Sequence, residues 1–397
     1  MLARHKAWLT HLFAAVQSLR SDAEGNHDLC LAIQEELLSR ITRAEGEIRG
    51  LRTATKARKA QLAKPGGNRE KSRRIKAEID ALKHRVGLKK HLISILRDVG
   101  DALAFIYFNR WDIKPFAFKE DPGFISGKKG TRLERAVLRR TNQLGAVVIM
   151  NDLTHSLRHG DVTVQLSSGQ MGLMELKSGR GGNRDRAERQ MAATQSVIDY
   201  INNDERKDEE AGVTLFRRAP HREAVFHVDE ANAALHDAIR NGHSFRQVEA
   251  GLTYICIADG GADLDTVLEP MLRSGQRPCI ISCNELKQHK LAYYPFVLSI
   301  ADPETAYAFV NGDVVLLVAT DLGHVTEFFR AAGLGFSITA DSAYPWQIAH
   351  EAHEQPVSVG FHIVGRLGAE FLSLAWLLEH FVESAAKMAF SSEALDL

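Results

Sequence analysis

Two stretches near the N-terminus repeat apolar residues in alternating steps of four and three, which is the spacing of a coiled coil. The first stretch spans residues 37–62 and the second spans residues 75–96, with Arg58 and Lys89 each occupying one apolar slot. Pro65, Gly66 and Gly67 lie between them and break helices. The pattern therefore predicts an antiparallel helical hairpin, each arm of about 25 residues reaching about 38 Å at 1.5 Å per residue.

The same segment carries a strong charge imbalance. Residues 40–100 hold eighteen Lys or Arg against six Asp or Glu, an excess of twelve positive charges, although the whole chain has a formal net charge of zero. This asymmetry indicates a polyanionic partner, because the basic residues that open the second arm repel one another unless phosphates lie alongside. They are Arg69, Lys71, Arg73, Arg74 and Lys76. An ordinary solvated face, or a surface that pairs protomers or binds a partner protein, is the alternative.

Aromatic residues concentrate just after the hairpin. Seven of them fall between residues 104 and 124: Phe105, Tyr107, Phe108, Trp111, Phe116, Phe118 and Phe124. We interpret this segment as a hydrophobic junction between the hairpin and the next domain, in preference to a platform on which bases stack.

A compact alternation of helical and strand patterns follows. We expect a helix at 131–143, strands at 146–150, 161–166 and 172–177, and a helix at 184–201. The charged stretch 204–210 is predicted to be an exposed linker. Beyond it, apolar runs at 253–258, 279–282, 296–300 and 314–319 alternate with helical patterns at 230–240, 264–272 and 325–332.

The resulting fold class is α/β (α+β), with an α-β-β-β-α core between the hairpin and a C-terminal α/β body. We predict three domains, at residues 1–103, 104–212 and 213–397. Residues 367–390 are the most apolar stretch, but charged side chains interrupt it well short of a membrane span, so it is expected to be an amphipathic core helix. No signal peptide is evident, and we expect a cytoplasmic protein that does not insert in membranes.

Residues 160–177 contain the side chains that phosphodiester hydrolysis requires. Asp161 begins one expected strand, and Glu175 and Lys177 lie two residues apart on the next, hence on one face. If the two strands form a hairpin, Asp161 and Glu175 lie at the same end and can share a divalent cation. Lys177 would then position the attacking water and offset charge in the transition state. The apolar neighbours of Glu175 predict a buried strand, which disfavours an ordinary exposed ion pair.

Gly160-Asp161 followed by Glu175-Leu176-Lys177, within the α-β-β-β-α order, resembles the PD-(D/E)XK nuclease superfamily over about residues 127–202. The resemblance implies that Asp161 and Glu175 bind the metal together with the backbone carbonyl of Leu176, and that Lys177 is the catalytic lysine. It also implies roles for Glu134 on the first helix and for Gln190 on the last, with Gln195 as the rival of Gln190. The proline that the family places before the first Asp is replaced by Gly160.

Basic and polar loops surround this motif. Lys128 and Lys129 precede the first helix and Arg180 follows the lysine strand, and such flexible loops suit a nucleic-acid backbone. His155 and His159 precede Asp161, where they can contact phosphate or simply be solvated.

These features together predict an Mg²⁺- or Mn²⁺-dependent nuclease that acts on DNA, with the hairpin gripping substrate or pairing protomers. By analogy with stand-alone nucleases of this kind, a role in restriction or anti-phage defence is expected. The alternatives are a non-catalytic coiled-coil scaffold or nucleic-acid-binding protein with a nuclease-like core, and an RNA-directed nuclease. For residues 213–397 we expect a regulatory or assembly role.

Overall fold

A computed structural model of the chain divides into two compact units, residues 1–194 and 195–397. The structure describes residues 2–64, 69–113, 124–127, 130–165, 171–176, 195, 198, 200, 203–208, 213–216, 222–258, 260, 263–273, 275, 277–286, 293–350 and 356–388. None of the helices in these ranges combines the length and the apolar character that crossing a membrane requires. The two predicted N-terminal domains, 1–103 and 104–212, fall within the first unit up to residue 194.

In its described residues, the first unit contains helices, two short 3-10 turns and one small sheet. Its elements are η1 (Ala3–His5), α1 (Lys6–Ser21), α2 (His27–Leu62), α3 (Arg69–Tyr107), α4 (Arg110–Ile113), α5 (Thr131–Gln143), β1 (Val148–Met150), η3 (Asn151–Leu153), β2 (Val162–Gln165) and β3 (Met171–Met174).

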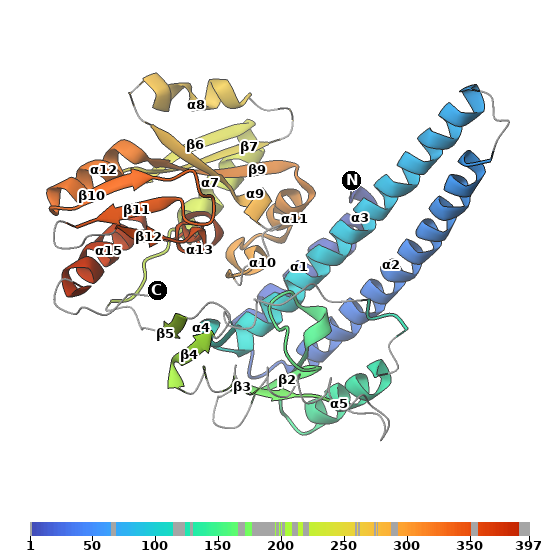
Figure 1. Ribbon diagram of the computed structural model, residues 1–397. Helices are drawn as coiled ribbons and strands as arrows, with labels where there is room; N and C mark the ends of the chain where they lie inside the picture. The colour runs from blue at the N-terminus through green and yellow to red at the C-terminus, as the bar shows by residue number, and fades with distance from the viewer. Residues whose placement is uncertain are drawn as a thin grey trace. The chain divides into compact units, whose positions relative to one another are not determined.

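The predicted hairpin is confirmed: α2 and α3 run side by side in opposite directions, in blue and cyan in Figure 1. The coiled-coil positions Leu37, Ile41 and Ile48 are fully buried, and Ile75 and Ile79 are nearly so. Arg58 and Lys89, which interrupt the apolar repeat, each reach a carboxylate on the opposite helix, Glu78 and Glu47 respectively. Ion pairs therefore fill the two slots that the apolar pattern leaves open.

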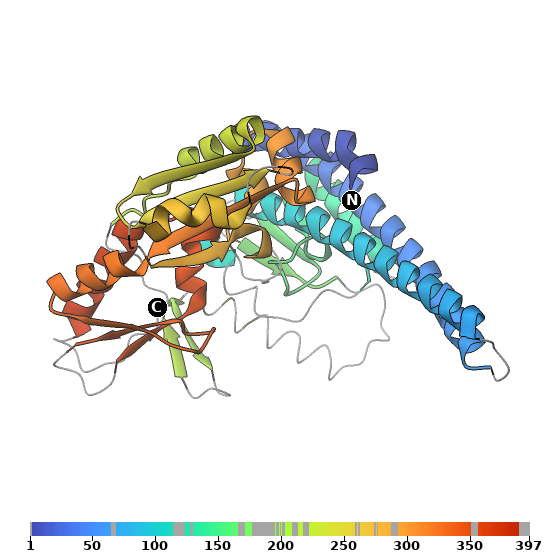
Figure 2. The same ribbon diagram turned by 90° about the horizontal axis from the view of Figure 1, so that it is seen from above.

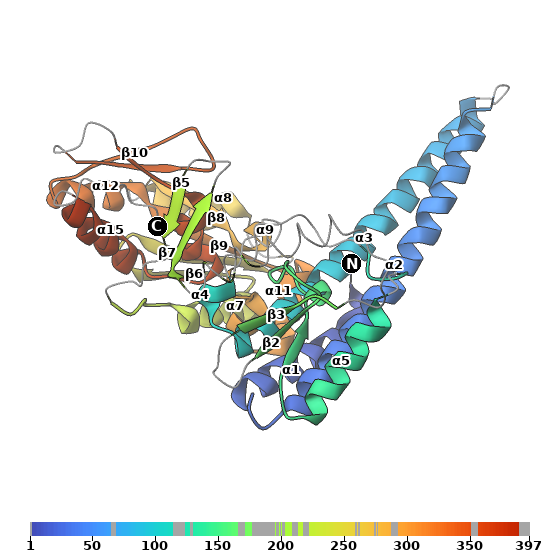
Figure 3. The same cartoon turned by 60° about the horizontal axis from the view of Figure 1, so that its bottom comes forward.

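The three strands of the first unit form one antiparallel sheet in the order β1-β2-β3. Figure 3 shows α5 and this sheet against the lower part of the hairpin, and α5 occupies the predicted range 131–143. The three strands lie within two or three residues of their predicted bounds. The helix predicted at 184–201 lies almost entirely outside the described residues.

The aromatic segment is buried at the end of α3, whereas Trp111 and Phe124 are half-buried. Phe105, Tyr107 and Phe108 at the end of α3 are each buried to more than nine-tenths. The carbonyl of Tyr107 accepts a hydrogen bond from Gln165 of β2 at 3.2 Å, so the end of the hairpin contacts the sheet directly. Phe116 and Phe118 lie outside the described residues.

The second unit also mixes helices with antiparallel sheets. Its elements are β4 (Glu205–Asp208), β5 (Val213–Phe216), α7 (Val228–Asn241), β6 (His243–Glu249), β7 (Leu252–Ala258), α8 (Leu264–Arg273), β8 (Pro278–Ser282), α9 (Cys283–Leu286), α10 (Phe296–Ser299), α11 (Pro303–Asn311), β9 (Val314–Asp321), α12 (Leu322–Ala331), β10 (Gly335–Ile338), β11 (Trp346–Ala349), β12 (Val357–Val359), α13 (Phe361–Val364), α14 (Arg366–Ala369) and α15 (Leu374–Met388).

A four-stranded antiparallel sheet, ordered β6-β7-β9-β8, forms the centre of this unit (Figure 2). Ile255, Leu317 and Ala319 form a buried cluster with Val267 and Met271 of α8 on one face. Ser244 and Arg246, on the opposite face, bind α7 through hydrogen bonds to Ala234 and Asp237. The alternation of side chains along the strands thus places α7 and α8 on opposite faces.

Two predictions for the second unit are wrong. The charged stretch expected to be a linker contains strand β4, which pairs with β5 in register Glu205↔Phe216. The apolar run at 296–300, expected among the strands, forms the short helix α10. The coarse class, a mixture of helices and antiparallel sheets, is the predicted one.

Candidate catalytic site

Asp161 directly precedes β2, and Glu175 directly follows β3. The pairing of the two strands ends with Val162 opposite Met174, so both acids lie at this end of the strand pair. The amide of Asp161 donates to the carbonyl of Met174 at 2.9 Å, and the amide of Leu176 donates to the Asp161 carboxylate oxygen Oδ2 at 2.7 Å. The two acids therefore lie at the same end of the strand pair, and Asp161 is hydrogen-bonded to the residues on both sides of Glu175.

Strand β3, which ends directly before Glu175, is more exposed than its apolar sequence predicts. The Met174 side chain is 44% exposed, and Glu175 is exposed as well. The expected burial of this strand is therefore wrong, because it forms the edge of a three-stranded sheet. Asp161 is half-buried, so the pair is open to solvent on the Glu175 side.

The backbone conformation of residue 160 explains why a glycine precedes Asp161. Its φ of +74° lies in the left-handed region, and a Cβ there would lie 3.0 Å from the carbonyl oxygen of Met174. Proline cannot adopt this conformation, because its ring fixes φ near about −65°. The backbone at residue 160 therefore has a conformation that glycine adopts and proline does not.

Asn151, which the sequence analysis did not single out, fixes the loop that leads into Asp161. Its buried side chain donates to the carbonyls of His159 and Gly160, at 2.6 and 3.2 Å, and accepts from Thr163 Oγ1 at 2.8 Å. Its backbone amide donates to the carbonyl of Asp161 at 3.0 Å. A polar residue directly after an apolar strand was the one available sequence signal.

The hairpin helix α3 holds the segment that follows Asn151. Oδ1 of the buried Asp101 accepts the amides of His155 and Ser156 at 2.9 and 2.8 Å, and the Ser156 hydroxyl at 2.6 Å. Burial raises the pKa of Asp101, while His155 and these hydrogen bonds oppose the rise. Nε2 of His155 contacts Ser94 at 3.3 Å and Asp98 at 3.5 Å on α3, so the ring of this histidine interacts with the hairpin.

The other hairpin helix, α2, holds the edge of the sheet and the loop before α5. Gln34, 1% exposed, donates to the carbonyl of Val148 at 2.8 Å and accepts the amide of Met150 at 3.0 Å, which satisfies two backbone groups of β1. Glu45, fully buried, accepts the amides of Ile125 and Ser126 at 3.1 and 2.7 Å. Each hairpin helix thus presents buried polar side chains to backbone groups of the first unit.

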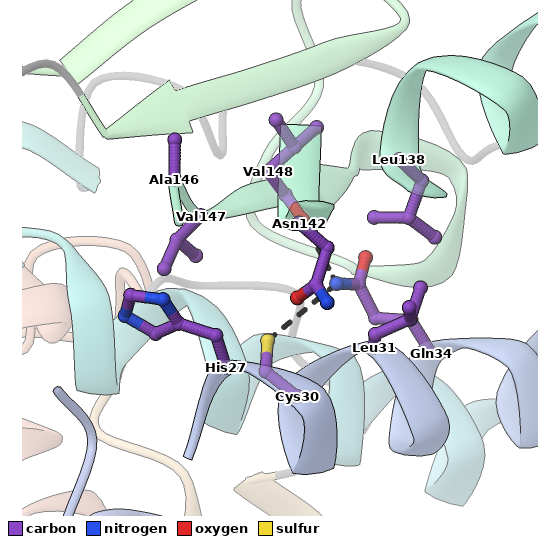
Figure 4. Close-up of a pocket in the computed structure, with 9 residues that line it drawn as sticks. All are labelled: His27, Cys30, Leu31, Gln34, Leu138, Asn142, Ala146, Val147 and Val148. Carbon is purple, nitrogen blue, oxygen red and sulfur yellow. Dashed lines mark hydrogen bonds between the residues drawn. The ribbon is translucent and has the colours of Figure 1, made fainter. Parts of the chain in front are cut away.

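A small opening lies where α2, α5 and β1 meet. Figure 4 shows Gln34 pointing from α2 toward Val148, with Cys30 beside it. Burial raises the pKa of the Cys30 thiol to about 12. A thiol in that state is protonated near neutral pH and is a poor nucleophile or metal ligand, so we interpret this opening as a packing junction.

The remaining predicted residues divide into two groups. Glu134 is 4% exposed, in the first turn of α5, where Oε1 lies 3.1 Å from the position that a Cβ on Gly130 would take. In the described part of the chain, Glu134 does not join Asp161 and Glu175 in a group of three metal donors. Lys177, Gln190, Lys128, Lys129 and Arg180 lie outside the described residues, whereas Gln195 is helical and exposed.

Asp161 and Glu175 fit a hard divalent cation in chemical type. Magnesium is commonly bound by one or two carboxylates, with water and substrate phosphates completing its shell. Oδ2 of Asp161 accepts one amide, and a carboxylate offers about four lone-pair sites, so both its oxygens retain capacity. Neither a protein-family model nor a curated protein nor a solved structure matches this chain.

Proposed function

We propose that the first unit is a divalent-metal-dependent nuclease of the PD-(D/E)XK type that hydrolyses phosphodiester bonds in DNA. The observation that carries this proposal is that Asp161 is hydrogen-bonded to the residues on both sides of Glu175, to the Met174 carbonyl through its amide and to the Leu176 amide through its carboxylate. Two carboxylates held side by side repel each other unless a cation lies between them. Metal binding explains why two acids are placed at the same end of this strand pair, with Glu175 exposed.

In this proposal Asp161, Glu175 and the Leu176 carbonyl hold Mg²⁺ or Mn²⁺. A cation bound there would stabilise negative charge on the phosphate and lower the pKa of an attacking water. The Leu176 amide fixes the orientation of the Asp161 carboxylate, and Asn151 fixes the loop before it. Lys177 would orient the water and offset developing charge, since it follows Glu175 by two residues in the chain.

The test is cleavage of plasmid, linear DNA and RNA by the purified full-length protein, with Mg²⁺ or Mn²⁺ and with EDTA. We expect metal-dependent DNA cleavage that falls at least about 100-fold in Asp161→Asn, Glu175→Gln and Lys177→Ala. Glu24→Gln, which removes an exposed carboxylate of the same unit, should cut at the wild-type rate. Wild-type cleavage by Glu175→Gln would refute the site, and cleavage of RNA alone would change the substrate class.

Glu134→Gln and Gln190→Ala should have smaller effects than the three central variants. Glu134 is buried in the first turn of α5 and, in the described part of the chain, stands outside any group of three metal donors. A loss in Glu134→Gln as large as that in Asp161→Asn would instead assign Glu134 a direct role in metal binding.

A further inference from the structure

We propose that the distal part of the hairpin binds the phosphate backbone of double-stranded nucleic acid without reading its sequence. This part, here called the arm, comprises residues 53–64, which include the end of α2, and residues 69–85 of α3. The inference names the form of the substrate for the proposed nuclease and rests on that function for its biological role. Binding itself does not depend on catalysis, so the two proposals can fail separately.

The arm concentrates exposed positive charge. It holds eleven Lys or Arg against three Asp or Glu, an excess of eight over its two segments. All eleven are exposed: Lys56, Arg58, Lys59, Lys64, Arg69, Lys71, Arg73, Arg74, Lys76, Lys83 and Arg85. A surface with this excess gains affinity for polyanions by releasing the counterions condensed on them.

Two of the three acids of the arm already contact basic side chains of the hairpin. Glu78 reaches Arg58 at 2.9 Å and Arg74 at 3.3 Å, and Asp80 reaches Lys83 at 3.1 Å. Arg69 and Arg73 lie four residues apart on α3, a spacing at which like charges destabilise a helix. The excess of cations is therefore unfavourable for the isolated hairpin, and phosphates alongside it would relieve the repulsion.

The composition of the arm favours a double helix over a single strand or a protein partner. Residues 53–85 contain no Phe, Tyr or Trp, the side chains on which unpaired bases stack. The apolar side chains turn inward, with Ile75 and Ile79 buried and Leu62 and Leu82 half-buried. Protein interfaces are enriched in exposed aromatic side chains, whereas rows of cations are typical of contacts with a phosphate backbone.

The arm is fixed to the unit that carries the candidate site. Its α3 segment of 17 residues extends about 25 Å at 1.5 Å per residue, which corresponds to about seven base pairs of duplex at 3.4 Å each. The same helix holds the segment before Asp161, through Asp101 and through Arg97, whose Nε donates to the carbonyl of Asp152 at 3.3 Å. A duplex on the arm would therefore be held by the helix that orders the loop of the candidate site.

The experiment measures binding of a labelled DNA duplex of about 30 base pairs to the full-length protein in EDTA, by fluorescence anisotropy. The arm variant carries Arg69→Gln, Lys71→Gln, Arg73→Gln and Arg74→Gln. Glutamine has nearly the helix propensity of these residues, so helix content by circular dichroism should not change. The matched control removes four exposed charges from the second unit, with Arg240→Gln, Arg273→Gln, Arg277→Gln and Arg330→Gln.

We expect the arm variant to bind the duplex at least about tenfold more weakly, with a salt slope shallower by up to about 3.6, since each phosphate contact contributes about 0.9. The control should bind as the wild type does, and an RNA duplex should show the same dependence on the arm. Equal affinity and slope in the arm variant and the control would overturn the proposal. Single strands bound as tightly as duplexes would overturn its duplex form.

Two further measurements distinguish duplex binding by the arm from a protein interface and from the proposed nuclease activity. If the arm variant keeps its affinity while its mass in solution falls from dimer to monomer, the arm is a protein interface and the proposal is overturned. Asp161→Asn should bind the duplex with wild-type affinity, since the binding assay contains no metal. If the arm variant binds the duplex more weakly but the wild-type protein cuts no nucleic acid, duplex binding by the arm is supported and the proposed nuclease activity is refuted.

Discussion

The base and the arm of one hairpin share a single sequence pattern but have different structures. In the base, here residues 27–52 and 86–107, most of the apolar line is buried, as at Leu37, Ile41 and Leu96, while Leu51 and Val86 next to the arm are half-buried. In the arm, Ile75 and Ile79 are buried and their apolar neighbours are half-exposed. The base thus belongs to the core of the first unit, while the arm carries basic residues on its exposed sides.

Buried polar side chains distinguish the base from the arm more clearly than apolar ones do. Gln34, Glu45 and Asp101 are each more than nine-tenths buried and accept backbone amides of the first unit. Burying such groups is costly unless every partner is in place, so they specify one docking geometry. Heptad spacing makes two helices pair, and these three residues determine how the pair attaches to the rest of the unit.

The largest effect should come from Gly100 at the base. A Cβ there would lie 1.9 Å from the carbonyl oxygen of Leu153, a backbone atom of η3, so Gly100→Ala forces the helix away. We expect a loss of about 3 kcal/mol in the free energy of unfolding. Gly87→Ala on the same helix meets no heavy atom of the described residues within 4 Å and should gain about 0.5–1 kcal/mol.

Urea denaturation followed by circular dichroism measures both glycine variants. Equal midpoints for Gly100→Ala and the wild type would show that α3 does not approach η3 this closely. Destabilisation by Gly87→Ala would show that this position is packed and that the open space around it is not real.

The next effect in size concerns Gln34, which binds the edge of β1. Gln34→Ala leaves the Val148 carbonyl and the Met150 amide unpaired in a buried site, and we expect a loss of about 2 kcal/mol or more. Gln61→Ala changes the same residue type on the same helix, but in the arm, where Gln61 is exposed and accepts from Arg58 at 2.8 Å. It should cost less than about 0.5 kcal/mol. Equal midpoints in urea for the two variants would contradict the assigned role of Gln34.

Asp101 should give a smaller, pH-dependent effect. Burial raises its pKa in the folded chain, so the folded state binds this proton more tightly than the unfolded state does. Stability from this group is therefore fully present below the ordinary aspartate pKa and is lost as pH rises through the folded value. Asp101→Asn keeps the Oδ1 acceptor and removes the titration.

The measurement for Asp101 is the difference in unfolding free energy between wild type and Asp101→Asn, from about pH 4 to about pH 8. As pH rises, the wild type should lose stability relative to Asp101→Asn. His155 faces this site and opposes the rise in the Asp101 pKa, so the difference reports Asp101 together with its interaction with His155. A difference that does not change with pH would show that burial does not govern this carboxyl.

Local sequence patterns predicted much of the first unit, and of the candidate site they predicted Asp161 and Glu175. Steps of four and three fix a coiled coil, and a period of two places Asp161 and Glu175 on neighbouring strands. The hydrogen bonds of Gln34 and Asp101 join residues 116 and 54 positions apart, and no local pattern encodes such contacts. Asn151 was missed for the same reason, since its role depends on where the chain returns.

The wrong predictions in the second unit have related causes. The stretch 205–208 consists of four charged residues, yet its backbone pairs with β5, and composition does not report backbone pairing. The run Phe296–Ser299 is too short for its apolar residues to distinguish a strand from a buried helical turn. In both places the tertiary environment decided the secondary structure.

The smallest effect should come from the ion pairs that fill the apolar slots of the hairpin. Arg58 and Glu78 in the arm are 44% and 34% exposed, whereas Lys89, which contacts Glu47 of the base, is 13% exposed. Double-mutant cycles to alanine should give about 0.2–0.5 kcal/mol for the arm pair and closer to about 1 kcal/mol for the pair with Lys89. High salt should reduce the first more than the second, because a partly buried pair is screened less. A stronger coupling in the arm pair than in the Lys89 pair would contradict this expectation. Ion pairs would then stabilise the arm more than the exposure of their side chains implies. The repulsion among the remaining basic residues of the arm would no longer require a polyanion.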